Sequence, residues 1–132
     1  MKKAQGFTLI ELMIVVGIIA LISAIAYPSY QDSVRKANRS DAMDTMLDTA
    51  QRLERCYTSY GSYNNVNCPL QTGAVVNSSH AHYKITATTT ASTYSLTAEP
   101  LSAQQTADTK CAKFELDNTG KKTSTPAGNT CW

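Results

Sequence analysis

The feature that most constrains this chain is an unbroken apolar run near its beginning, from Phe7 to Tyr27. An α-helix of this length spans about 30 Å, which matches the hydrocarbon core of a bilayer. The run contains one charged residue, Glu11. A carboxylate at the centre of a bilayer costs roughly 2.5–3.5 kcal/mol, so Glu11 needs a partner.

A short basic segment, Met1–Gly6, precedes the run and ends in glycine. A cut after Gly6 would make Phe7 the N-terminus and place a free amine four residues before Glu11. Within one chain these two charges could pair weakly. Between two neighbouring chains that are offset by about one helical turn, they could pair well.

The sequence Gly6-Phe7-Thr8-Leu9-Ile10-Glu11-Leu12 resembles the N-terminal signature of type IV pilins and their pseudopilin relatives. The resemblance implies that a prepilin peptidase cuts after Gly6 and methylates the new terminal Phe7. It also implies that Glu11 guides docking of the subunit into a filament. The alternative is an ordinary membrane anchor with an incidental glutamate.

The position of the basic segment also predicts the topology of the chain. The small residue precedes the apolar run, whereas a secretory signal has its cleavage site after the run. Positive charge favours the cytoplasmic side, so the chain beyond Tyr27 is expected to face the outside of the inner membrane. We therefore expect a leader at 1–6 and a transmembrane segment at 7–27.

Four cysteines are an even number in a domain placed in an oxidising compartment, which favours disulfides. Of the three possible pairings we favour Cys56–Cys68 and Cys111–Cys131, because each closes a local loop. Each would stabilise the fold by roughly 3 kcal/mol in the loop-entropy model. A zinc site is the weaker alternative, since the close C-x₂₋₄-C spacing is missing.

The helical pattern continues beyond the apolar run, with interruptions at Gly17 and Pro28. Glycine costs about 1 kcal/mol and proline about 3 kcal/mol in a helix interior. The family resemblance implies a long curved helix that can soften between these residues; the alternative is a plain kink. From Ser29 the helix becomes amphipathic and is expected to stop near Gly61. Its expected buried face comprises Val34, Ala37, Met43, Met46, Leu47, Ala50, Leu53 and Tyr57.

Residues 61–82 are rich in turn formers and are expected to form a loop. Three segments then alternate apolar and polar residues: 83–89, 94–99 and 112–117. This period of two predicts strands with one buried face, joined as antiparallel neighbours. Lys121–Ser124 is expected to return as a short edge strand. The prediction is an α+β chain with a long helix, 7–60, packed on a small antiparallel sheet of three to four strands in a head, 61–132.

The tail Thr125–Trp132 ends in Cys131-Trp132. A bridge from Cys111 to Cys131 would fold the tail onto the third strand, and this region resembles the C-terminal disulfide loop of type IVa pilins. With the Cys-x-x-Phe-x-Leu strand before it, the tail looks most like that of PilE-type minor pilins.

The formal net charge is +2, and removal of Lys2 and Lys3 with the leader would bring it to zero. The sequence contains no motif for a catalytic centre, cofactor or phosphate loop, so we expect no enzyme activity and no cofactor. His80 and His82 are a weak candidate metal pair. A DNA-binding head would need a basic, aromatic-bearing patch, for which five lysines offer material: Lys84, Lys110, Lys113, Lys121 and Lys122.

The leading interpretation is a minor type IV pilin that supports pilus biogenesis, twitching motility and adhesion. Its expected partners are other pilin subunits, the prepilin peptidase and the inner-membrane assembly machinery. It would wait in the inner membrane and end in the extracellular pilus. Three alternatives stay open: a major pilin, a DNA- or surface-binding pilin, and a type II secretion pseudopilin. Nucleic acid is the less favoured partner.

Overall fold

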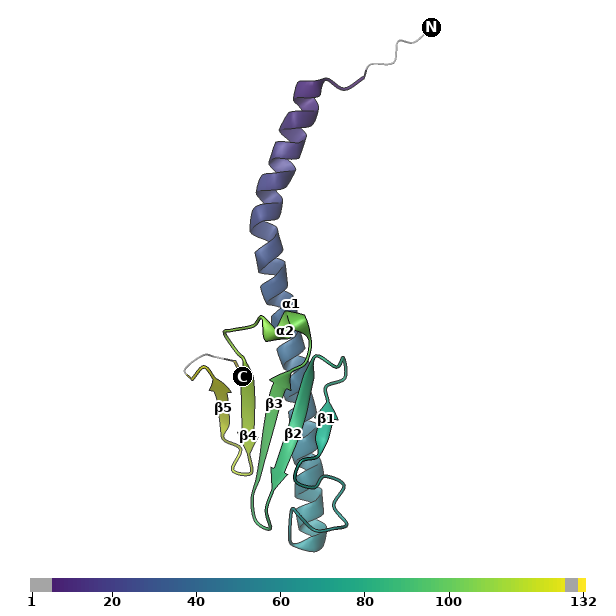
Figure 1. Ribbon diagram of the computed structural model, residues 1–132, viewed down its shortest axis with the longest axis vertical. Coiled ribbons are helices and arrows are strands. Elements are labelled where there is room, and N and C mark those ends of the chain that lie inside the picture. Colours follow the sequence, from purple (N-terminus) through teal and green to yellow (C-terminus); the bar gives the residue numbers. More distant parts are fainter. Residues whose placement is uncertain (1–5, 128–130) are drawn as a thin grey trace. The chain divides into compact units, whose positions relative to one another are not determined.

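The computed structural model describes residues 6–127 and 131–132 and divides the chain into two compact units, 1–34 and 35–132 (Figure 1). Most of the expected leader, Met1–Gln5, and part of the expected tail, Gly128–Thr130, lie outside the described residues.

The first unit consists mainly of the beginning of helix α1 (Leu9–Tyr60). The helix is continuous through Gly17 and Pro28. Its apolar side chains are exposed all around this part of the helix, including Leu9, Ile18 and Ile25. Softening at Gly17 and Pro28 stays a prediction.

The second unit contains a five-stranded sheet in which every strand pairs antiparallel with the next strand along the chain. A short helix, α2, connects the third strand to the fourth. The elements are β1 (Val75–Asn77), β2 (Tyr83–Thr89), β3 (Tyr94–Pro100), α2 (Ala103–Thr106), β4 (Lys113–Asp117) and β5 (Lys122–Thr125).

One face of this sheet packs against the part of α1 that belongs to the second unit (Figure 1). The three predicted alternating strands are confirmed. In each of them every second residue is buried, as the period-two pattern requires. Helix α1 contributes Met46 and Leu53 to the same core. The buried strand residues are Tyr83, Ile85 and Ala87 in β2, Tyr94, Leu96 and Ala98 in β3, and Phe114 and Leu116 in β4.

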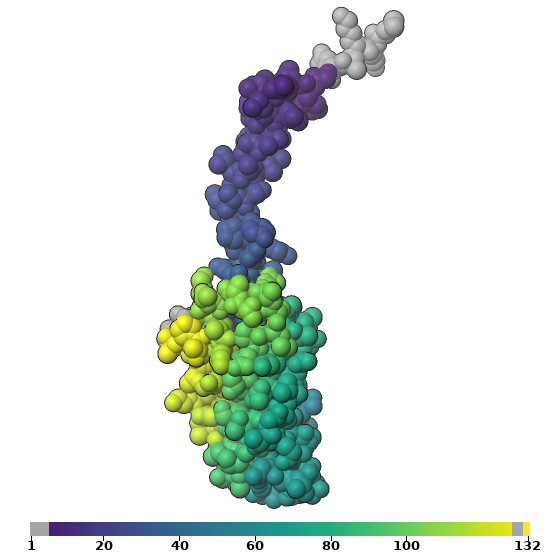
Figure 2. Space-filling model, viewed as in Figure 1, coloured from purple at the N-terminus to yellow at the C-terminus, as the bar shows by residue number. Residues whose placement is uncertain are grey.

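The opposite face of the sheet carries the polar residues of β2, β3 and β4. This side of the head faces the viewer in Figure 2, where the sheet runs from teal through green to yellow. Directly opposed pairs on this face include Thr86 with Thr97 and Lys84 with Glu99. Buried and solvent-facing residues alternate along the strands, so only one face of the sheet is apolar. Helix α1 therefore needs to cover that face alone.

The predicted helix stop is also confirmed. Helix α1 ends at Tyr60, and Gly61 follows with φ +68°, a left-handed conformation that glycine adopts without a Cβ penalty. The Gly61 amide donates a 2.7 Å hydrogen bond to the Tyr57 carbonyl, which satisfies one of the last carbonyls of the helix.

Three expectations about the head need correction. The sheet has five strands because Val75–Asn77, expected to lie in a loop, pairs with β2. The connection before β4 contains α2, which the sequence pattern does not predict. The buried face of α1 is also rotated: Ala37, Leu47 and Tyr57 are exposed. The core positions include Ala42, Thr49 and Cys56 instead.

Candidate functional site

The first candidate region is the beginning of α1, where the expected cleavage and assembly residues lie. Phe7 is 86% exposed and the helix starts two residues later, at Leu9. The Thr8 hydroxyl accepts a 3.3 Å hydrogen bond from the Glu11 amide, so Thr8 acts as the N-cap. This holds Gly6 and Phe7 outside the helix, where a protease could reach the bond between them.

The capping role of Thr8 was missed in the sequence pattern, although the signal was present. Thr8-Leu9-Ile10-Glu11 has the S/T-x-x-E spacing of a capping box. Glu11 lies in the first turn, where a carboxylate interacts favourably with the positive end of the helix dipole. Within the described residues no ion pair involves Glu11.

The apolar surface that follows Glu11 is the second feature of this region. By length and composition, α1 could cross a membrane, and no residue of its most apolar stretch is buried. An apolar surface that surrounds a helix is far larger than soluble monomers normally expose. A surface of this kind favours an apolar surrounding, such as lipid or other apolar helices.

Two disulfides fix the head. The structure joins Cys56 to Cys68 and Cys111 to Cys131, with Cα–Cα distances of 5.7 Å and 5.8 Å. The first ties the loop after α1 to the last turns of that helix. The second ties the end of the chain to the segment before β4 and is buried at both cysteines.

The residue after this second disulfide, Trp132, packs on the sheet edge. Its ring meets Phe114 edge to face at 5.9 Å between centroids, and its Nε1 donates a 2.7 Å hydrogen bond to the Thr123 carbonyl. The Lys122 ammonium lies 5.0 Å from the centre of the same ring. Trp132 therefore belongs to the packing of β4 and β5.

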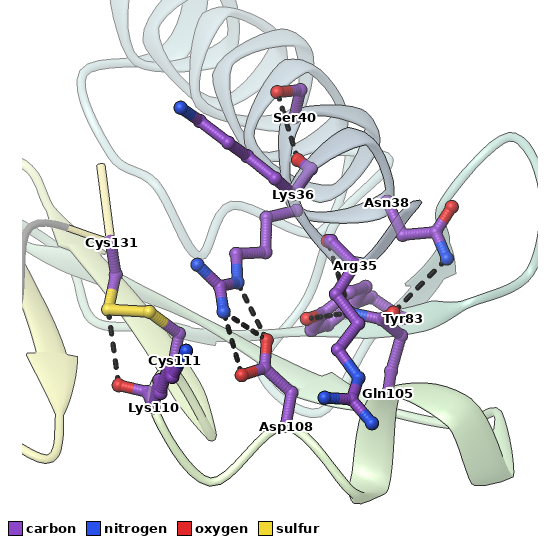
Figure 3. Close-up of polar contacts among 11 residues, drawn as sticks. Arg35, Lys36, Asn38, Ser40, Tyr83, Gln105, Asp108, Lys110, Cys111 and Cys131 are labelled. Carbon is purple, nitrogen blue, oxygen red and sulfur yellow. Dashed lines mark hydrogen bonds and ion pairs between the residues drawn. A yellow bond between two sulfur atoms is a disulfide. The ribbon is translucent and has the colours of Figure 1, made fainter. Parts of the chain in front are cut away.

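A buried polar cluster joins α1 to the segment around α2 (Figure 3). The Arg39 guanidinium donates two hydrogen bonds to the Asp108 carboxylate. Gln105, which is fully buried, accepts a hydrogen bond from Asn38 Nδ2 and donates one to the Tyr83 hydroxyl. The Arg39 side chain is 15% exposed and that of Asp108 is 2% exposed, so this ion pair lies mostly out of contact with water.

A second link between distant segments joins α1 to the turn before β2. Asp41 accepts a 3.2 Å hydrogen bond from the His80 amide, and its carboxylate lies 3.5 Å from His80 Nδ1. Burial opposes ionisation of Asp41, but hydrogen bonds from Ser78 and His80 outweigh it and lower its pKa.

His80 and His82, the weak candidate metal pair, each lie beside a different polar partner. The His80 ring is mostly exposed beside Asp41, and His82 Nδ1 lies 3.2 Å from the Ser102 hydroxyl. In the part of the chain that the structure describes, no group of three or more candidate ligands could hold a metal ion.

The five lysines proposed as a basic patch are not one uniform patch. Glu99 pairs with both Lys113, at 2.6 Å, and Lys84, at 3.1 Å. Hydrogen bonds from Lys113 and then Lys84 lower the pKa of Glu99, and Glu99 in turn raises the pKa of Lys113. These two lysines are neutralised on the outer face of the sheet, and Lys122 lies over Trp132.

The tyrosines at the end of α1 divide into packed and exposed side chains. Tyr63 is 5% exposed, stacks on Tyr57 at 4.5 Å and meets Tyr94 edge to face at 5.0 Å. Burial, then the nearby Glu54 carboxylate, raises the pKa of Tyr94 to about 12. Tyr63 and Tyr94 are core residues, whereas Tyr60 is half exposed.

Comparison with protein families identifies two adjacent matches. Residues 1–27 match a model of the prokaryotic N-terminal methylation motif. Residues 28–115 match a model described as type IV minor pilin ComP, DNA uptake sequence receptor. Together the two matches cover the apolar run, the rest of α1 and the sheet as far as β4.

Individual relatives point the same way. A segment of 56 residues, 42% of this chain, is 48% identical to prepilin peptidase-dependent protein D of Escherichia coli (strain K12). A segment of 42 residues, 32% of this chain, is 55% identical to a fimbrial protein of Moraxella nonliquefaciens. These segments span 38% and 27% of the two relatives, respectively.

A solved structure resembles a larger part of the chain. A type IV pilin from Shewanella oneidensis is 32% identical, and the match covers 74% of this chain and 97% of that one. The TM-score is 0.55.

Proposed function

Because the chain belongs to the type IV pilin family, with residues 28–115 in the group of the minor pilin ComP, we propose that it is a pilus subunit assembled through its N-terminal helix. The observation that carries the proposal is the first unit itself. It presents an apolar surface on every side and a single carboxylate in its first turn, Glu11.

The proposed processing step is cleavage between Gly6 and Phe7, followed by methylation of the Phe7 amine. The Thr8 cap supports this assignment because it starts the helix after the bond to be cut. Cleavage creates a positive charge close to Glu11. In a bundle of such helices, the amine of one subunit would meet the Glu11 carboxylate of a neighbour and remove the cost of an unpaired charge in an apolar surrounding.

The proposed location follows from the same unit. Before assembly the apolar part of α1 holds the chain in the inner membrane, with the disulfide-bonded head in the periplasm. After assembly the helices form the core of an extracellular pilus. The partners are other pilin subunits, the prepilin peptidase and the assembly machinery of the inner membrane.

We propose a minor rather than a major role, since the family model that matches the head is that of a minor pilin. In that role the chain supports pilus biogenesis, and through it twitching motility and adhesion. Two alternatives are a major pilin, which would differ in copy number, and a type II secretion pseudopilin, which would differ in the filament that it joins.

Incorporation of a Glu11→Ala variant into filaments tests the assembly proposal. We expect the variant to stay in the membrane fraction and to be strongly depleted from sheared filaments. The matched control is Asp44→Ala, which removes an exposed carboxylate elsewhere on α1. Incorporation of Glu11→Ala at the wild-type level would contradict the role of Glu11.

DNA binding by the head is a second candidate function. It is favoured by the matched family model, whose description names ComP as a DNA uptake sequence receptor. After cleavage at Gly6 the first unit retains two charged residues, Glu11 and Asp32, both acidic, so the head carries a net positive charge. Attraction to phosphates would follow, with an affinity that falls as salt rises.

Direct binding to labelled DNA at several salt concentrations tests this second function. The full mature chain in detergent should bind, and the logarithm of its affinity should fall linearly with the logarithm of salt concentration. Absence of binding at low salt would rule it out.

A further inference from the structure

A cavity of about 280 Å³ lies where α1 ends, beside the Cys56–Cys68 disulfide. Its lining includes Arg52, Arg55 and Tyr60 from the helix and Pro69 from the loop that follows. We propose that this cavity binds one unpaired nucleotide of a DNA strand, with the phosphate at the arginines and the base against Tyr60. The inference rests on the proposed DNA-binding function and gives it a site.

The charge of the cavity is the first argument. Arg52 and Arg55 lie three residues apart on α1, so they share a helix face. Arg52 pairs with Asp48 at 2.7 Å, but both side chains are more than half exposed, so this pair contributes little stability and can exchange partners. Among the residues that the structure describes, no carboxylate lines the cavity.

Arg55 is the more available of the two cations. Its Nε donates a long 3.4 Å hydrogen bond to the Gln51 carbonyl, and across residues 6–127 and 131–132 no carboxylate forms an ion pair with it. The adjacent Glu54 carboxylate accepts hydrogen bonds from the buried Tyr63 hydroxyl instead. A guanidinium of this kind can donate two parallel hydrogen bonds to a phosphate.

The aromatic wall is the second argument. Tyr60 is 49% exposed, in contrast to the buried ring of Tyr63. The hydrophobic core therefore does not use Tyr60, and its ring is open to a ligand. Aromatic rings beside cationic grooves are the usual means of binding unpaired bases, because every base has a face that can stack.

The rigidity of the helix end and the loop that line the cavity is the third argument. The disulfide between Cys56 and Cys68 fixes the loop to the helix, and Gly61 turns the chain sharply directly after Tyr60. Pro69, next to Cys68, has a fixed φ. A site held in this way loses little conformational entropy when it binds a ligand.

The size of the cavity limits the ligand. Small-molecule sites usually measure about 300–1,000 Å³, and this one, at about 280 Å³, lies just below that range, which suits a ligand no larger than one nucleotide. A base inside a duplex has both faces covered by its neighbours, and the terminal base of a blunt end is joined to its partner, so that the whole base pair would have to fit in the cavity. We therefore expect the site to prefer a DNA end with an unpaired overhang over a blunt end.

The experiment measures binding of the full mature chain, in detergent, to a fluorescent duplex with a single-stranded overhang and to the same duplex with blunt ends. Arg55→Gln should lower affinity for the overhang DNA by roughly ten- to a hundredfold, as expected for loss of a hydrogen bond to a charged group. It should also lower the magnitude of the salt slope by about 0.7, the value for one phosphate contact on a single strand. Tyr60→Ala should lose affinity without changing the salt slope, and Tyr60→Phe should retain it.

The matched control is Lys121→Gln, which removes one exposed positive charge at the turn between β4 and β5. Thermal melts of each variant check that the head is folded. If wild type binds DNA but Arg55→Gln and Tyr60→Ala bind as tightly as wild type, the cavity proposal is overturned while the DNA-binding function stands. Equal losses for Arg55→Gln and Lys121→Gln, with none for Tyr60→Ala, would also overturn it. If wild type binds neither DNA, both proposals fail.

Discussion

Arg39 on α1 and Asp108 after α2 form a bidentate ion pair across 69 residues of sequence, with both hydrogen bonds 2.7 Å long. The Asp108 side chain is 2% exposed and that of Arg39 15%. Two charges this far from water are tolerated because each satisfies the other. The pair fixes the segment before β4 on the helix, close to the Cys111–Cys131 disulfide (Figure 3).

Removal of one partner should therefore be costly. Asp108→Ala leaves the Arg39 guanidinium buried without a counterion, and we expect a loss of about 3–5 kcal/mol in the free energy of unfolding. Urea denaturation followed by Trp132 fluorescence measures this loss. The control is Asp48→Ala, which breaks the exposed pair with Arg52 and should cost no more than about 1 kcal/mol. Equal losses for the two variants would contradict the structural role of the buried pair.

The second disulfide should hold Trp132 on the sheet. Replacing Cys111 and Cys131 by serine releases a loop with a sequence separation of 20, and the loop-entropy model predicts a loss of about 3 kcal/mol. The emission of Trp132 should shift to longer wavelength, because its contacts with Phe114 and Thr123 depend on the bridge. The matched variant without the Cys56–Cys68 disulfide should lose stability without that spectral shift. An unshifted emission in the Cys111–Cys131 variant would show that the edge packing alone holds Trp132.

The link between Asp41 and His80 predicts an acid dependence of stability. The pKa of Asp41 is lowered in the folded state, so its ionised form stabilises the fold above its ordinary value of 3.8. That contribution is lost as pH falls through the folded pKa. The difference in unfolding free energy between wild type and Asp41→Asn should be largest above about pH 5 and should shrink toward pH 2. A difference that stays constant over this range would refute the link.

The cleavage proposal makes a separate prediction for Gly6. Gly6→Val places a branched side chain at the bond to be cut, so the peptidase should leave the leader attached. An immunoblot of the membrane fraction should show a larger species than wild type. Gly17→Val is the matched control, since, among the described residues, a Cβ at Gly17 meets nothing within 4 Å beyond its chain neighbours and the adjacent turns of helix backbone. A mature Phe7 terminus in Gly6→Val would refute the assignment of the cleavage site.

Features set by neighbouring residues were predictable from the sequence. The apolar run, the helix stop before Gly61 and the alternation in β2, β3 and β4 each follow from a local pattern, and the structure confirms them. The N-terminal signature led to the family for the same reason, because its residues are contiguous.

Features set by contacts between distant residues were not predictable. Strand β1 has three residues and no alternation of its own; it exists because Val76 pairs with Ile85. The buried position of Arg39 depends on Asp108, which lies far along the chain, and a helical wheel cannot show such a partner. The small rotation of the buried face of α1, which exposes Leu47 and buries Thr49, follows from how the sheet packs and not from the spacing of apolar residues.

The most direct test of the pilin assignment is mass spectrometry of sheared surface filaments from cells that express this chain. Our account predicts an N-terminal peptide that begins at methylated Phe7, present in small amounts relative to other pilins. A dominant amount of the same peptide would make the chain the major pilin. Absence of the chain from filaments, or its presence with Met1–Gly6 still attached, would contradict the account.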